Sequence, residues 1–114
     1  MEIIWSQASL QHLKDIAEYV ANKFGQQTAI KTLEKIQKKA NGLCKFPESG
    51  LLNRKYSTPE YTVHHVTIAP NVLYYMVYPD AIVIAVIVHT KQSPTTVDKI
   101  LKNFLEHYEH KKSR

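Results

Sequence analysis

The stretch from Val72 to Lys91 constrains the fold most, because it holds two apolar runs separated only by Pro79 and Asp80. The second run, Ala81 to Val88, has no polar side chain and is rich in Val and Ile, which favour strands. A strand that is apolar on both faces belongs inside a sheet covered on each side. The run is too short to cross a membrane as a helix, which needs roughly 20 apolar residues. We therefore predict a buried strand, paired as a hairpin with residues 72–78.

The size and composition of the chain limit its class. At 114 residues it fits one domain that buries a core without disulfides or metal. The single Cys44 lies in an apolar helical pattern and is predicted to be a buried structural thiol. Because Met1–Trp5 is also too short and too acidic for an export signal, we expect a cytoplasmic protein. A net charge of +5 suits an acidic protein, nucleic acid or a ribosome surface, without choosing among them.

Two helices are predicted in the first half of the chain, after a short strand at residues 2–5. Ser6 is suited to cap the first helix, and Gly25 ends it before a second helix over residues 26–45. The short break at Gly25 predicts an antiparallel helix hairpin. Lysines on the outer face of the second helix are typical of solvated surface, with a binding role as the alternative. The predicted apolar stripes are Leu10, Leu13, Ala17, Val20 and Phe24, then Ala29, Leu33, Ile36, Ala40 and Leu43; the lysines are Lys31, Lys35 and Lys38, with Lys39 and Lys45 nearby.

The second half of the chain is predicted to be mostly strands. A turn at residues 46–50 and a loop at 51–59 lead to a strand over 61–68, and residues 69–71 turn the chain into the apolar hairpin. Ser93 followed by Pro94 predicts the start of a last helix, with a basic, frayed end from His110 onward. The order is strand, two helices, three strands and a helix. It predicts an α+β fold, with the helices together on one face of a mainly antiparallel sheet.

Several short motifs follow one another along residues 1–92. They are Trp5–Ser6, Gly25, the segment from Leu43 to Gly50, the Val-Leu-Tyr-Tyr of residues 72–75, Ile82–Ile84 and Val88–His89. In this order and spacing the chain resembles the RelE/ParE superfamily of toxins from type II toxin–antitoxin systems. The long helix hairpin is more similar to the ParE branch. The resemblance implies a single RelE/ParE-like domain over 1–114: an N-terminal strand, an antiparallel helix hairpin, a mainly antiparallel sheet and a C-terminal helix at about 94–110.

The resemblance also implies partners. It implies a growth inhibitor neutralised by a cognate antitoxin, whose disordered acidic tail folds across the toxin, in a possible hetero-oligomer. The ParE branch implies DNA gyrase as the target. The alternatives are a RelE-like enzyme that cleaves mRNA on the ribosome, and a degenerate member that only binds antitoxin. Places where the family often has arginine hold Val63 or His64, and Asn71, which lack a positive fork for phosphate. We expect no cofactor and no membrane partner.

A ribonuclease would need a base, an acid and cations for the developing negative charge. Histidine suits both proton roles because its ordinary pKa is about 6.5. Alternation along the strand lets only one of His64 and His65 face a given site. The histidines lack metal-ligand spacing, so no metal site is predicted. The alternative is structural: a histidine that caps a strand end, and tyrosines that pack across strands. The candidates for catalysis are His89, His64, Arg54 and Lys91, and those for binding are Lys55, Tyr56, Asn71 and Tyr75.

Overall fold

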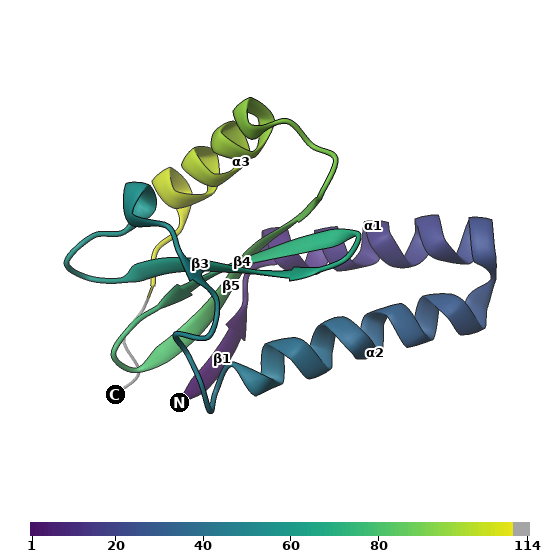
Figure 1. Cartoon of the computed structure of the whole chain (residues 1–114), viewed down its shortest axis with the longest axis horizontal. Helices are drawn as coiled ribbons and strands as arrows, with labels where there is room; N and C mark the ends of the chain where they lie inside the picture. Colours follow the sequence, from purple (N-terminus) through teal and green to yellow (C-terminus); the bar gives the residue numbers. More distant parts are fainter. Residues whose placement is uncertain (111–114) are drawn as a thin grey trace.

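The computed structural model describes residues 1–110, so residues 111–114 of the basic end predicted from His110 onward lie outside the described residues. In chain order the elements are β1 (Glu2–Trp5), α1 (Gln7–Phe24), α2 (Gln26–Gly42), β2 (Leu51–Leu52), the 3-10 helix η1 (Arg54–Tyr56), β3 (Thr62–Ile68), β4 (Asn71–Val77), β5 (Ala81–His89) and α3 (Pro94–His107) (Figure 1). The predicted order of the main elements is confirmed. No helix in the described part of the chain combines the length and apolar character needed to cross a membrane.

The strands form one sheet in the order β1-β5-β4-β3-β2, with β1 parallel to β5 and the other pairs antiparallel. Every residue of Ala81–Val88 is buried, which confirms the prediction of an interior strand. The segment 51–59, predicted to be a loop, instead contains β2 and η1. Leu51 and Leu52 extend the sheet by pairing with His65 and His64.

A β-bulge interrupts β5. Tyr74 of β4 lies opposite Val86 and Tyr75 lies opposite Ile84, so Ala85 is the extra residue. The Ser6 hydroxyl donates to the carbonyl oxygen of Ala85 at 2.6 Å, and the amide of Ile87 donates to Nδ1 of His12 at 3.1 Å. Burial lowers the pKa of His12, against the opposing effect of Asp15, which keeps the ring neutral and able to accept. The start of α1 therefore satisfies backbone groups of β5 at and beyond the bulge, where β1 no longer pairs with this strand.

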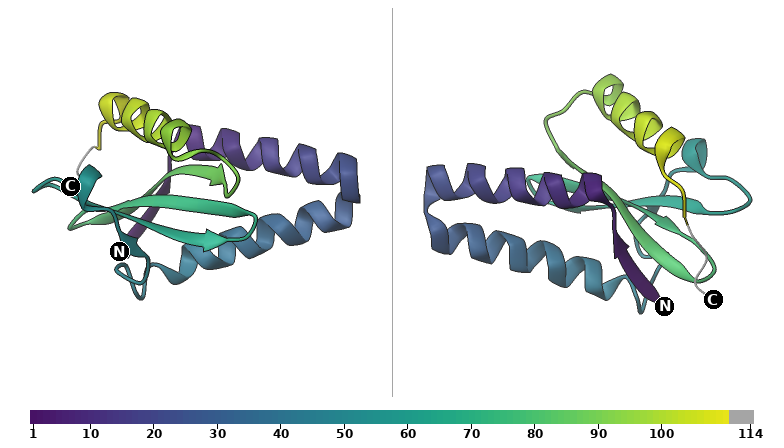
Figure 2. Two further views of the ribbon diagram at one scale, coloured as in Figure 1. Left: turned by 45° about the horizontal axis from the view of Figure 1, so that its top comes forward. Right: turned by 180° about the vertical axis from the view of Figure 1, so that it is seen from behind.

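The two faces of the sheet are covered by different helices (Figure 2). The α1–α2 hairpin covers one face, where Ile36, Ala40 and Leu43 pack with Ile82, Ile84 and Ile87. On the opposite face, Leu101 of α3 packs with Val86 and Val88, and Phe104 lies against the cluster around Met76 and Val83. The prediction that all helices share one face is wrong for α3. Because β5 is apolar throughout and successive side chains of a strand point to opposite faces, both faces of the sheet need a cover.

Some details of the helices differ from the predicted stripes. The hairpin extends beyond the sheet (Figure 1), so Phe24 at its tip is 65% exposed, and Leu10 is 51% exposed. The buried side of α1 runs instead through Ser9, Leu13 and Ile16. Gly25 has φ +94°, a conformation that side chains disfavour, between α1 and α2. At the other end of the chain, α3 stops at His107, and the His110 ring packs on Tyr78 with centroids 4.0 Å apart.

Candidate functional site

The candidates at the end of β5 take part in a turn. His89 is exposed and pairs across the sheet with Asn71, which is 7% exposed. Nδ1 of His89 accepts from the amide of Lys91 at 3.0 Å, and the His89 amide donates to the Gln92 side chain at 2.9 Å. The Lys91 side chain is exposed. These contacts give the His89 ring a role in capping the turn that leads to α3.

His64 and Tyr75 lie inside the protein, on the face covered by the helix hairpin. His64 is 4% exposed, and its ring stacks on Tyr75 with centroids 5.3 Å apart. Tyr75 is completely buried. Its hydroxyl donates to the Pro47 carbonyl at 2.7 Å and accepts from the Gly50 amide at 3.0 Å, and burial raises its pKa. The pair fastens the turn after α2 to the sheet, so the Tyr75 ring is enclosed within the core.

The two histidines predicted for catalysis do not meet. His64 lies opposite Tyr75 of β4, and His89 lies on the other side of β4, opposite Asn71, which precedes Tyr75 by four residues. Two strand spacings and four residues of rise place their Cα atoms roughly 15 Å apart. His65 points to the other face, as alternation predicts, where its ring contacts Tyr74. Burial, and then the neighbouring His64, lower the pKa of His65.

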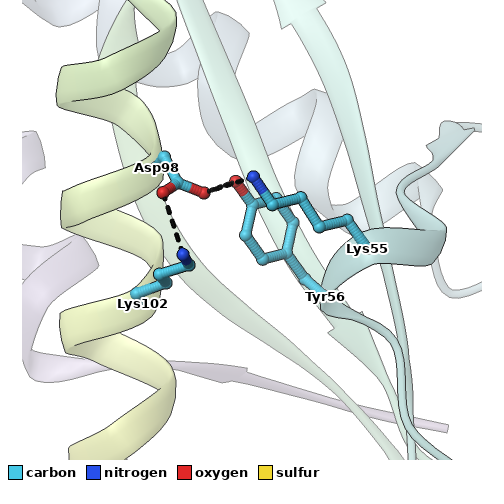
Figure 3. Close-up of polar contacts among 4 residues, drawn as sticks. All are labelled: Lys55, Tyr56, Asp98 and Lys102. Atoms are coloured by element: carbon cyan, nitrogen blue, oxygen red, sulfur yellow. Dashed lines mark hydrogen bonds and ion pairs between the residues drawn. The ribbon is translucent and has the colours of Figure 1, made fainter.

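Lys55 and Tyr56 form a polar cluster with α3, and Arg54 precedes them in η1 with an exposed side chain. The Tyr56 hydroxyl donates to Oδ1 of Asp98 at 2.5 Å. Nζ of Lys55 lies 2.9 Å from the same oxygen, and Nζ of Lys102 lies 3.2 Å from Oδ2 (Figure 3). Burial, followed by the bond to Asp98, raises the pKa of Tyr56 to about 12. The bonds from Tyr56 and Lys55 hold the pKa of the Asp98 carboxyl well below its usual range.

The Lys55–Tyr56–Asp98–Lys102 cluster joins η1 to α3. Sequence reasoning selected two of its members as binding residues and missed Asp98, for which the only local signal was Lys102 one turn later. The rings of Phe104 in α3 and of Tyr108 at its C-terminal end stack with centroids 5.1 Å apart and pack against the sheet. The ring of Tyr74 packs among the side chains that α3 covers. The binding candidates in η1 are therefore engaged by the chain's own C-terminal helix.

The candidates thus occupy three separate places: the turn after β5, the core under the hairpin, and the contact between η1 and α3. The residues that could supply positive charge are also divided: Arg54 and Lys55 lie in η1, and Lys91 lies in the turn after β5. Among residues 1–110, no group of three histidine, cysteine or acidic residues is arranged to hold a metal ion. The arrangement supports binding surfaces better than acid–base chemistry, which needs the acid and base at one reacting centre.

Comparison with known proteins places the fold. The family model described as "ParE toxin of type II toxin-antitoxin system, parDE" matches residues 3–94. A solved structure titled "Chromosomal ParDE TA system from P. aeruginosa" matches with a TM-score of 0.63 and 19% identity, over 78% of this chain and 95% of that one. No curated protein matches the sequence. The family match stops at the first residue of α3, so nearly all of that helix lies beyond it. The chain belongs to the ParE family of toxins of type II toxin–antitoxin systems.

Proposed function

We propose that this toxin arrests growth by binding DNA gyrase, and that a cognate antitoxin neutralises it. The observation that carries the proposal is the separation of the candidate nuclease residues. His64 is enclosed in the core and His89 caps a turn roughly 15 Å away. A protein without a shared acid–base centre acts more readily by occupying a target than by cleaving one.

The residues at the positions where the superfamily often carries arginine support the same proposal. Val63 is completely buried, and His64 and Asn71 are also buried. None of them offers the fixed planar cation that clamps a phosphate during transfer. The mRNA-cleaving alternative has no such support from the geometry.

A supercoiling assay with purified gyrase and purified toxin tests the target. We expect micromolar toxin to inhibit supercoiling and to trap gyrase on cleaved DNA, and we expect toxin mixed beforehand with its antitoxin to do neither. In cells that express the toxin alone, DNA synthesis should stop before protein synthesis. Undisturbed gyrase together with early arrest of protein synthesis would refute the gyrase proposal and favour mRNA cleavage.

The antitoxin proposal has its own test. We expect co-expression of the toxin with its cognate antitoxin to restore growth and to give a complex that co-elutes in size-exclusion chromatography. Both faces of the sheet are covered by helices of the toxin itself, so an antitoxin tail would fold across a surface that includes these helices. Growth that is equally arrested with and without the co-expressed protein would refute this partner.

A further inference from the structure

We propose that the lysine face of α2 binds the phosphate backbone of duplex DNA. We define the lysine groove by Lys35, Lys38 and Lys39 and by the hollow that they line. The inference rests on the proposed function in one respect: it assigns a DNA contact to a toxin whose proposed target, gyrase, holds DNA.

The positive charge of the described chain is concentrated on α2. Gln26–Gly42 contains four lysines and one glutamate, which gives this helix a net charge of +3. Of the chain's net charge of +5, three units come from Lys111, Lys112 and Arg114, so residues 1–110 carry +2. Outside α2, the described residues therefore sum to −1. A polyanion is attracted to this helix rather than to the described surface as a whole.

The lysines of α2 have no partners within the described residues. The described lysines that form ion pairs are Lys55 and Lys102, and both pair with Asp98. Glu34 stands one turn before Lys38, a spacing at which an ion pair can form, yet none is formed between them among residues 1–110. Lys31, Lys35 and Lys39 follow one another at four-residue spacing, where like charges repel and weaken a helix. The lysines therefore contribute little to the fold, and their ammonium groups are available to a ligand.

The lysine groove is a hollow of about 590 Å³ between the C-terminal half of α2 and the end of β3. Within residues 1–110 no acidic side chain lines it, and Ser49 and Thr67 add hydroxyl groups that can donate to phosphate. Lys35, Lys38 and Lys39 lie within about 6 Å along the helix axis. That length spans fewer than two steps of a DNA strand at ~3.4 Å each, so three flexible lysines reach successive phosphates.

Duplex DNA fits this face better than an acidic amphipathic peptide does. Such a peptide needs a row of apolar anchors at helical spacing. In α2, Ile30 is the exposed large apolar side chain, and it lies a full turn or more before the groove. Phe46 is exposed at one end of the groove, a single anchor beside three cations. Repeated charge without a row of apolar side chains is the pattern expected for backbone contacts.

The test measures binding of the purified toxin to a fluorescent duplex of about 25 base pairs by anisotropy at several salt concentrations. The variant K35Q/K38Q/K39Q removes the groove cations. The matched control K14Q/K23Q/K99Q removes the same charge from α1 and α3. If the three groove lysines contact phosphates, the slope of log K against log salt should fall by about 2.7 in the groove variant. Raising salt from 50 to 200 mM should then weaken the wild type about 40-fold more than the groove variant.

We expect the control variant to keep the slope of the wild type. We expect the groove variant to keep the wild-type melting temperature, because the three lysines that it replaces form no ion pair within residues 1–110. Equal slopes for the two variants, or no binding by the wild type, would overturn the proposal. Displacement of the duplex by poly-glutamate at equal charge would also overturn it, in favour of an acidic protein. A toxin that binds DNA without inhibiting gyrase refutes the proposed function alone, whereas inhibition without DNA binding refutes this inference alone.

Discussion

Replacing Tyr75 by phenylalanine removes one buried hydroxyl and should destabilise the protein measurably. The hydroxyl holds the Pro47 carbonyl and the Gly50 amide at 2.7 and 3.0 Å. Losing it leaves a donor and an acceptor without their partner, at about 1–3 kcal/mol for each buried group. Because both bonds are only partly buried, we take the low end and expect a loss of about 2 kcal/mol in the free energy of unfolding.

For a domain of this size, about 2 kcal/mol corresponds to a fall of roughly 8 °C in melting temperature. Circular dichroism or calorimetry on purified protein measures it. The neighbouring Tyr74 provides a matched control, because its hydroxyl forms no hydrogen bond among residues 1–110 and the change Tyr74→Phe removes the same atom. We expect that control to shift the melting temperature by less than about 2 °C. Equal shifts for the two variants would refute the assignment of Tyr75 to the fold.

Three further changes test other parts of the structure. Asp98→Asn should remove a pH dependence: the lowered pKa of Asp98 gives stability that is present above the usual carboxyl value of 3.8 and is lost as the pH falls below it. The melting temperatures of wild type and variant, measured from pH 6 to 2, should therefore converge in acid; a constant difference would contradict the assigned ion pairs. Leu101→Ala should cost about 2–5 kcal/mol in urea denaturation, because Leu101 is 1% exposed on the side of α3 that packs on the sheet; a cost below about 1 kcal/mol would show that α3 packs loosely. Gly50→Ala places a Cβ 2.7 Å from both the His65 carbonyl and the Tyr75 hydroxyl and should cost about 1–3 kcal/mol, whereas Gly42→Ala points into open space and should be neutral or stabilising.

Local patterns predicted the parts of the fold that depend on burial along one element. The apolar run at Ala81–Val88 predicted an interior strand, and the spacing of Ile36 and Ala40 predicted the buried side of α2. Each of these signals is contained in neighbouring residues. The exposed tip at Phe24 was not predictable in this way, because the stripe shows which side of a helix is apolar and not how far the sheet extends beneath it.

Contacts between residues that are far apart in the sequence could not be predicted from the local pattern of apolar and polar residues. The bulge at Ala85 lies in a wholly apolar run, so nothing local marks it, and its partner Ser6 is 79 residues away. The enclosure of Tyr75 depends on the turn after α2 reaching its hydroxyl. His64 and His89 looked like a possible pair because strand register, which sets their separation, is fixed by the turns and by packing and not by residue type.

The helix beyond the family match has a consequence for how long the toxin survives. In this chain Leu101 and Phe104 of α3 cover the second face of the sheet. The apolar side chains of β4 and β5 on that face are therefore shielded from water by the toxin itself. We expect a copy that has lost its antitoxin to stay dissolved and resist proteases on its own account. The lifetime of the free toxin in the cell would then depend on its own fourteen-residue helix α3 rather than on a bound partner protein.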